Sequence, residues 1–454
     1  MDRRRGPAMK VQRATVFFAL AALAACSGKT LERADLLDPA NCKDCHPDHY
    51  REWSGSMHAY AADDPVFLAL NQKGQRETNG ALGDFCVKCH APIALEEGLT
   101  HDGLNLADVP RPMKGVTCYF CHSVEAVEGE HNNPLVLSDD LVLRGGIEDP
   151  VDNEAHHSEY SALHDRTQRD SSTLCGPCHD VVSPKGVAIE RTYQEWQASL
   201  YSHDTPAELQ TCGRCHMAGR DGLAADYPGV KVRRVQAHTF AAVDVALTPW
   251  PEMEAQRNEV QRQLDPTLFN QLCVTRVTGG LDVEVDLENF AAGHAFPSGA
   301  SADRRVHVEL IATLGGEVVF SSGALAPGQR LVDLVDPNLW RLGDRLYDTQ
   351  GQEVHTFWAA DRYEGQLLIA PTTIAPWDPD YVNPHYRRTY RIPGLADRIT
   401  LRVFLQPIGV DILDQLIQSG DLDPVIRDRM PTFELRNSFV EWTTELGEGC
   451  TPQT

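Results

Sequence analysis

Long apolar runs are missing from this sequence of 454 residues. The apolar stretch Val16 to Ala25 is too short to cross a bilayer, and no later run is long enough. Basic residues are also scarce, with 41 Lys and Arg against 65 Asp and Glu and a formal net charge of −24. That balance argues against charge-driven binding to nucleic acid or to an anionic membrane face. It fits a soluble, exported surface, or docking to basic partners.

The beginning of the sequence has the features of a bacterial export signal. Basic residues come first, and the apolar stretch then ends in Leu23-Ala24-Ala25-Cys26. Small residues before a cysteine resemble a lipobox, in which that cysteine is lipidated; an ordinary signal peptide with a chance cysteine is the alternative. We therefore expect a signal peptide at residues 1–25 and a lipidated tether at residues 26–40. The protein would be an exported bacterial lipoprotein, on the periplasmic side of the outer membrane or at the cell surface.

Cysteine, in contrast, is plentiful. Ten of the 13 cysteines form five C-x-x-C pairs, and a histidine follows each pair. The five motifs are Cys42-x-x-Cys45-His46, Cys86-x-x-Cys89-His90, Cys118-x-x-Cys121-His122, Cys175-x-x-Cys178-His179 and Cys212-x-x-Cys215-His216.

This spacing is the attachment signature of c-type haem. Two thiols on one helical turn add to the two vinyl groups of a porphyrin, and the adjacent histidine reaches the iron. Zinc sites need no histidine directly after each pair, and a thioredoxin-type motif would occur once. The sequence therefore predicts five covalently attached haem c groups, with five motif histidines as iron ligands.

Three cysteines remain outside the motifs. Cys26 is assigned to the lipid. Cys273 and Cys450 flank the C-terminal region, and in an oxidising compartment they are candidates for a disulfide that closes it. Two unpaired thiols are the alternative, because spacing alone does not show proximity.

Two regions of different character follow the tether. Residues 41–245 hold every motif and lack clean periodicity, as expected where haem takes the place of a side-chain core. Residues 246–270 include a polar helical stretch, and apolar residues then alternate with polar ones over residues 271–450. We expect an α+β multidomain protein. A mainly α and irregular multihaem domain is followed by an antiparallel β-sandwich-like domain.

One short pattern occurs twice. Tyr50-Arg51-Glu52-Trp53-x-x-Ser56 matches Tyr193-Gln194-Glu195-Trp196-x-x-Ser199. The spacing of Tyr50, Trp53 and Met57 places them on one helical face. Either both segments are plain amphipathic helices, or both pack aromatic rings on haem edges and present a histidine, His58 or His203.

Thirteen of the 18 histidines lie outside the motifs, and a bis-histidine haem needs a second imidazole from elsewhere in the chain. The candidates for this distal role are His58, His131, His156, His157, His238 and His294. His101, His164 and His203 are further possibilities. His49 is too close to His46 in sequence to reach the same iron from the other face.

These residues resemble a known family. Cys42 to His46 with Tyr50, Trp53, Ser56 and His58 is similar to the opening of the cytochrome c-554-type multihaem cytochromes, and Gly115 to His122 is similar to their third motif. Gly293 to Gly299 resembles a β-domain motif in related bacterial cytochromes. The resemblance implies closely stacked haems with mostly bis-histidine iron, and distal roles for His58 and His131. Cytochrome c-554 itself has four haems, so the fifth motif and the β domain are departures.

Two functions are compatible with these features. In the first, the protein relays electrons between periplasmic and outer-membrane or extracellular partners, with other redox proteins as donor and acceptor. In the second, it is an oxidoreductase acting on a small nitrogen or sulfur species at one five-coordinate haem, for which the His90 motif is the candidate. No C-x-x-C-K motif occurs, which weighs against the nitrite-reductase type. We expect an electron carrier more than an enzyme.

The lipobox interpretation predicts the behaviour of a Cys26→Ser variant. It should keep its haems but lose its membrane association, because the lipid anchor has no attachment point. Haem staining of membrane and soluble fractions measures this, with Ser27→Ala as the matched control. If Cys26→Ser stays in the membrane fraction, Cys26 is not the anchor.

Overall fold

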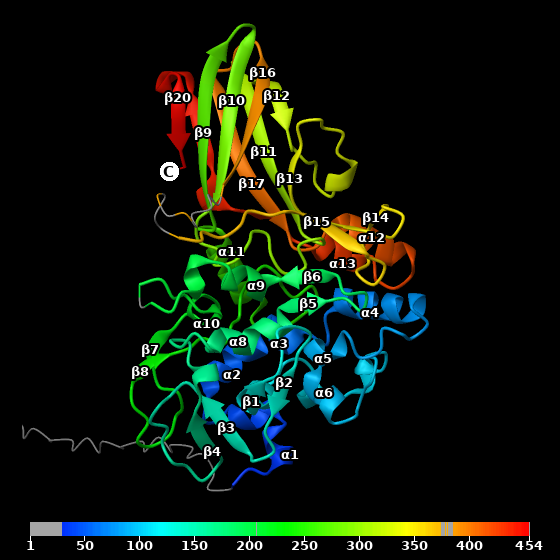
Figure 1. The fold of residues 1–454 in the computed structure, drawn as a ribbon, viewed down its shortest axis with the longest axis vertical. Helices are drawn as coiled ribbons and strands as arrows, with labels where there is room; N and C mark the ends of the chain where they lie inside the picture. Colours follow the sequence, from blue (N-terminus) through cyan, green and yellow to red (C-terminus); the bar gives the residue numbers. More distant parts are fainter. Residues whose placement is uncertain (1–29, 206, 374–376, 378, 380–384, 454) are drawn as a thin grey trace, which may run out of the picture.

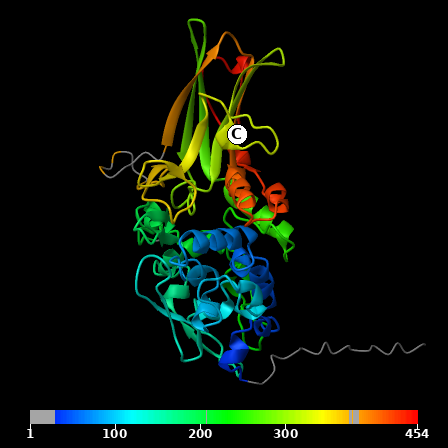
Figure 2. The ribbon, with the colours of Figure 1, turned by 90° about the vertical axis from the view of Figure 1, so that its right-hand side faces the viewer.

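The computed structural model describes residues 30–205, 207–373, 377, 379 and 385–453. The expected signal peptide and Cys26 lie outside these residues. Within the described part of the chain, no helix is both long and apolar enough to cross a membrane. The molecule is elongated, with a region of short helices and loops at one end and long strands at the other (Figures 1 and 2).

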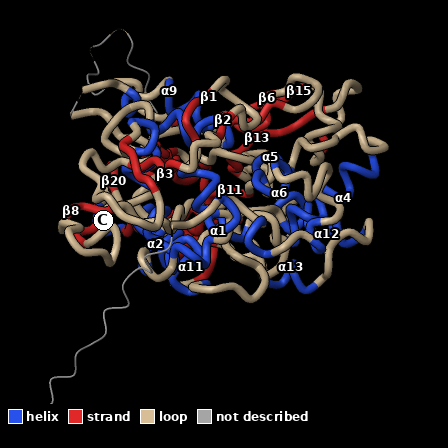
Figure 3. The backbone as a smooth tube through the Cα atoms, turned by 90° about the horizontal axis from the view of Figure 1, so that it is seen from below, coloured by secondary structure: helices blue, strands red, loops and turns tan. Residues whose placement is uncertain are grey.

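The region that holds the five motifs consists of short helices and two-stranded ribbons joined by loops (Figure 3). Its helices are α1 (Arg33–Leu36), α2 (Pro47–Ser54), α3 (Met57–Tyr60), α4 (Pro65–Glu77), α5 (Val87–His90), α6 (Pro92–Glu96), α7 (Cys118–His122), α8 (Ser171–Cys175), α9 (Thr192–Gln197) and α10 (Cys212–His216). Its ribbons pair β1 (Val124–Val127) with β2 (Leu135–Leu137), β3 (Val142–Gly145) with β4 (His157–Tyr160), β5 (Asp180–Val182) with β6 (Ala188–Arg191), and β7 (Arg220–Gly222) with β8 (Arg233–Val235).

The single helical face expected for Tyr50, Trp53 and Met57 is interrupted. Helix α2 ends at Ser54, and Gly55 and Ser56 separate it from α3. The Ser56 hydroxyl accepts a hydrogen bond from the Ala59 amide, which caps the new helix. A side chain on Gly55 would lie 2.6 Å from the Cβ of Glu252, so the chain turns here against a distant segment.

Helix α11 (Met253–Leu264) leads into the strand-rich region. Its strands are β9 (Leu268–Val277), β10 (Gly280–Asn289), β11 (Arg305–Leu314), β12 (Glu317–Ser322), β13 (Trp340–Tyr347), β14 (Glu353–Val354), β15 (Arg362–Gln366), β16 (His385–Pro393), β17 (Arg398–Gln406), β18 (Phe433–Glu434), β19 (Val440–Thr443) and β20 (Gly449–Pro452). The short helices α12 (Val410–Gln418) and α13 (Val425–Arg429) follow β17.

These strands form two antiparallel sheets. One has the order β16-β10-β9-β20, and the other has the order β14-β13-β11-β17-β18, with β12, β15 and β19 paired at its margins. Strand β10 alternates between buried and half-buried positions along its whole length, because successive side chains point to opposite faces. The expected α+β organisation, with an antiparallel sheet region after the motifs, is confirmed.

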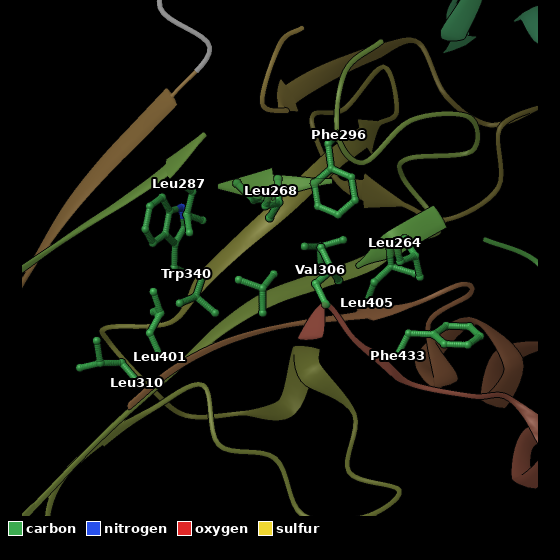
Figure 4. Packing of buried hydrophobic residues seen from close by; sticks show 14 of the residues in the cluster. Leu264, Leu268, Leu287, Phe296, Val306, Leu310, Trp340, Leu401, Leu405 and Phe433 are labelled. Atoms are coloured by element: carbon green, nitrogen blue, oxygen red, sulfur yellow. The ribbon is translucent and has the colours of Figure 1, made fainter. Parts of the chain in front are cut away.

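One apolar core fills the space between the sheets and continues past them. Figure 4 shows Leu268, Leu287, Val306 and Leu405 packed together with Leu264 of α11. The same core reaches Val66 and Ala69 of α4 in the motif region. Burial of each such side chain contributes about 1.5–3 kcal/mol to stability. Helix α11 is thus a packed element between the two regions.

Ion pairs add to this junction. Arg304, which is 8% exposed, donates two hydrogen bonds to the Asp244 carboxylate at 2.5 and 2.8 Å. Arg76 of α4 binds both carboxylate oxygens of Asp421 at 2.6 Å. Bidentate geometry of this kind fixes orientation as well as adding energy. The two regions are therefore held in one relative position.

The last strand is joined to the sheet by a covalent bond. Cys273 and Cys450 lie directly opposite each other on β9 and β20 and form a disulfide. Of the two alternatives that the sequence left open, the structure contains the bridged one.

The disulfide predicts the stability of a Cys273→Ser/Cys450→Ser variant. Its unfolding free energy should fall by about 2–4 kcal/mol, because the bridge restricts the unfolded chain over a long loop. Denaturant unfolding followed by far-UV circular dichroism measures the loss, and Thr451→Ser on the same strand is the control. The haem absorption spectrum should not change. An unchanged midpoint would mean that the bridge does not stabilise the sheet.

Candidate haem-binding site

A single cavity of about 1140 Å³ runs through the motif region. Both cysteines and the histidine of every motif line it, as do His58, His156, His238 and His294. Many of the residues that line it are apolar. The space is continuous from the first motif to the fifth.

Four of the five motif histidines are held by backbone carbonyl groups. The Nδ1 atom of His46 lies 2.7 Å from the oxygen of Ala224, and that of His122 lies 2.6 Å from the oxygen of Arg144. His90 and His216 make the same contact with Ala61 and Ala241, at 3.1 and 2.7 Å. A carbonyl at Nδ1 fixes the tautomer that presents Nε2 to a metal.

Four motif histidines face a second imidazole across a gap of nearly constant width. The ring centres are 6.3 Å apart for His46 and His156, for His58 and His179, and for His216 and His294, and 6.4 Å apart for His122 and His238. Two metal–nitrogen bonds of about 2 Å each separate facing nitrogens by about 4 Å, and the two ring radii bring the centres to about 6 Å. The observed gaps therefore match an iron atom held between two imidazoles.

Three of the four opposing histidines also have a backbone carbonyl group at Nδ1. The Nδ1 atom of His294 lies 2.8 Å from the Ala295 oxygen, and that of His238 lies 3.1 Å from the Gln236 oxygen. His156 Nδ1 contacts the His157 oxygen at 3.2 Å. Each of these rings also keeps Nε2 available.

Burial favours the neutral form of His58 and His179, which face each other. Burial, together with the nearby imidazoles of His179 and His216, lowers the pKa of His58 to about 3. Burial likewise lowers the pKa of His179 to about 4. Only a deprotonated ring nitrogen can bind iron, so the site favours the form that coordinates.

The His90 motif differs from the other four. Phe67 of α4 stacks on the His90 ring with centres 3.9 Å apart and an angle of 2°. Among the described residues, no second histidine faces His90 at the spacing seen in the other pairs. His101, the histidine nearest to it in sequence, is exposed.

The structure does not bring every candidate histidine to a motif. His131 and His157 are exposed, and neither has a ring contact with a motif histidine in the described part of the chain. The distal roles expected for them have no geometric support. His203 is also peripheral, with its ring 3.4 Å from the Glu208 carboxylate. His164 stacks on His122 with centres 5.6 Å apart, but its Nε2 is used by the Cys121 carbonyl at 2.8 Å.

The repeated sequence pattern forms the same structure twice. Trp53 donates its indole hydrogen to the Val116 oxygen at 2.8 Å, and Trp196 donates to the Gln210 oxygen at 2.8 Å. Each acceptor stands two residues before a motif, the third and the fifth. In both motifs the next residue, Thr117 or Thr211, caps the short helix with its hydroxyl.

The glutamate of each repeat holds the opposite side of the same motif. The Glu52 carboxylate accepts a hydrogen bond from the His238 amide at 2.9 Å, and His238 faces His122. The Glu195 carboxylate accepts from the Ala295 amide at 3.2 Å, next to His294, which faces His216. Sequence reasoning found the repeat but missed this role of the glutamates. Their identical position in the two copies was the available signal.

The third motif and His58 are also joined directly. The Val116 amide donates to the His58 oxygen at 2.8 Å. Gly115 has a φ of +75°, and a Cβ there would lie 2.5 Å from the same oxygen. Glycine is therefore required where the two segments meet.

The residues of the cavity fit c-type haem. Paired cysteines with a histidine directly after each pair, imidazoles that face each other across four gaps of iron-spanning width, and apolar walls are the donor set and surroundings that haem c requires. When bound, haem supplies iron that changes between two oxidation states; the chain supplies its attachment, its ligands and its dry surroundings.

Known proteins agree with this assignment. A family model described as cytochrome c554 and c-prime matches residues 41–123, which contain the first three motifs. The crystal structure of a penta-heme cytochrome c552 from Thermochromatium tepidum superposes with a TM-score of 0.63 at 20% identity. The alignment covers 91% of this chain and 100% of that one. No curated protein matches the chain.

The protein is therefore a multihaem c-type cytochrome, a class that transfers electrons. Within that class, residues 41–123 resemble the cytochrome c554 family, and the fold over 91% of the chain is similar to that of the Thermochromatium protein.

The facing rings predict the effect of His294→Ala. Removal of this imidazole should open one iron position at the fifth motif, so one haem per chain should change from low spin to high spin and bind added cyanide. Electron paramagnetic resonance and optical titration measure the change. His131→Ala is the control and should leave the spectrum unaltered. A spectral change in His131→Ala but not in His294→Ala would reverse the assignment of the distal ligand.

Proposed function

We propose that this chain is an exported electron carrier that holds five haem c groups and relays electrons between other redox proteins. The observation that supports it best is the unbroken cavity, because all five motifs open into the same interior. Four of them place an imidazole on each side of the iron position, which leaves no place for substrate there.

The thiols of different motifs lie close together, which gives the motifs an order. Cys42 and Cys118 are within hydrogen-bonding reach, as are Cys89 and Cys178. The pKa of Cys175 is raised by its hydrogen bond to Cys212, by burial and by the charge of Cys121. The first motif therefore adjoins the third, the third adjoins the fourth, and the fourth adjoins both the second and the fifth. This arrangement of neighbouring motifs supports electron transfer from one end of the cavity to the other.

The charge and the start of the sequence support the cellular setting. A net charge of −24 favours docking to donors or acceptors with a basic surface. The lipobox at Cys26 would keep the carrier on the periplasmic side of the outer membrane or at the cell surface. Both redox partners would then meet the protein outside the cytoplasm.

A second candidate function rests on the His90 motif. No imidazole of the described residues faces His90, so a small nitrogen or sulfur species has a position to occupy there. The buried phenyl ring of Phe67 fixes the plane of the His90 imidazole. In this case the other four motifs would deliver electrons to a reaction at the second.

Redox stoichiometry and ligand binding test the two candidates together. A pyridine haemochrome assay should give five haems per chain, and full reduction should take up five electrons. Four haems should be low spin in the ferric state, and the one at the second motif should be high spin and bind nitric oxide. Fewer than five haems would contradict the relay.

The nitric oxide result separates the second candidate from the first. If no haem binds nitric oxide, the substrate reaction is excluded and the relay remains. If binding occurs, turnover of nitrogen and sulfur compounds with a reduced dye as donor decides whether the open position is used. His101→Ala is the matched control, since His101 is exposed and should alter neither measurement.

A further inference from the structure

A second pocket, of about 430 Å³, lies in the sheet region. Its polar lining comes from Arg341 and Arg345 on β13, Arg388 on β16, Glu353 on β14, His355 and Gln366. Three of these six side chains are guanidinium groups, in a chain whose net charge is −24. The pocket is therefore a local concentration of positive charge in a protein with an excess of acidic residues.

The fold brings the three arginines together from two sheets. Arg341 and Arg345 are separated by an even number of positions on β13, so their side chains share a face, opposite the buried Leu342 and Leu346. Arg388 belongs to the other sheet, and its Nη1 donates to the Leu339 oxygen at 2.8 Å. This bond holds the third guanidinium at the beginning of β13.

The residues that line the pocket do not balance this charge among themselves. Glu353 is the one carboxylate among the pocket-lining residues, and it lies 3.5 Å from Arg341. The neighbouring carboxylate, Asp411, is already bound by Arg305 at 3.0 and 2.6 Å. Burial and the charges of Arg345 and Arg305 lower the pKa of Arg341. The lining therefore has two more positive than negative side chains.

We propose that this pocket binds a small oxyanion of the sulfate or phosphate class. Guanidinium groups present paired N–H donors that match two oxygens of one anion, and an anion would offset the repulsion between Arg341 and Arg345. Gln366 adds an amide that can donate to a third oxygen. The pocket is open enough for a small anion and is not needed for haem attachment.

The pocket also adjoins the haem cavity. His355 lines both spaces, and its Nε2 is 4.0 Å from the Asp411 carboxylate. A bound anion would thus be separated from that cavity by the His355 side chain. This site is independent of the proposed relay, because none of its residues holds a haem.

Isothermal titration of the complete haem-loaded protein tests the proposal. Sodium sulfate and sodium phosphate are titrated at constant ionic strength set with sodium chloride. Saturable binding at one site per chain is expected for at least one of the two. Arg341→Gln and Arg345→Gln should each weaken it about ten-fold or more, as expected when a charged hydrogen-bond pair is lost.

Arg362→Gln is the matched control. Arg362 lies on β15 outside the pocket and pairs with Glu364, so the variant loses the same charge but should bind as the wild type does. Arg345 is exposed, so Arg345→Gln is the variant expected to keep its wild-type melting temperature and haem spectrum. The proposal is overturned if neither anion gives saturable heat, or if the two pocket variants bind with wild-type affinity.

Discussion

The motif region depends on a neutral histidine whose Nε2 is kept free. At four of the five motif histidines a carbonyl group lies at Nδ1, and that carbonyl comes from a segment at least 22 residues away. The contact between His46 and Ala224 joins residues 178 positions apart. Each such contact requires a loop to bring its carbonyl group to a particular point on the cavity wall. The region is therefore built from loops held at both ends more than from layers of packed helices. The short helices and many loops in Figure 3 agree with this requirement.

The repeated segment shows how one local sequence serves two sides of a site. Its tryptophan holds the chain just before a motif, and its glutamate holds the loop that carries the facing histidine. The two copies differ at the position two residues after the capping serine, where the first has His58 and the second has Tyr201. His58 faces the fourth motif, whereas the Tyr201 hydroxyl donates to the Phe290 oxygen at 3.2 Å.

The sequence carries more information about attachment than about coordination. The ten motif cysteines and the five adjacent histidines stand out in it because covalent attachment of haem requires a fixed spacing. The sequence of β10 also predicts a strand directly, because apolar and polar residues alternate along it with a period of two, which is typical of a strand. The partner of each motif histidine could not be found this way. His58 faces the fourth motif and not the first, which precedes it most closely, because the order of facing rings is set by how loops return across the cavity.

Two histidine expectations illustrate the same limit. His131 follows the third motif closely in sequence, yet it is exposed, and the more distant His238 faces His122. His156 and His157 are neighbours, but one ring enters the cavity while the other points to solvent, as alternation at the start of β4 requires. Sequence proximity therefore carries little information about which imidazole reaches which iron.

The sheet region is part of the haem site and not an appended module. His294, which faces His216 of the fifth motif, lies in the loop between β10 and β11. That loop is fixed from the sheet side, because Asn289 donates to the His294 oxygen at 2.8 Å and Phe296 exchanges backbone hydrogen bonds with Leu368 at 2.8 and 2.9 Å. It is fixed from the motif side by Glu195. A shift of the sheets relative to α9 would move one ligand of the fifth iron position but not the other. The shared core through α11 and α4, together with the Arg304 ion pair, opposes that shift. The rigidity of the junction is thus a condition for coordination at the fifth motif.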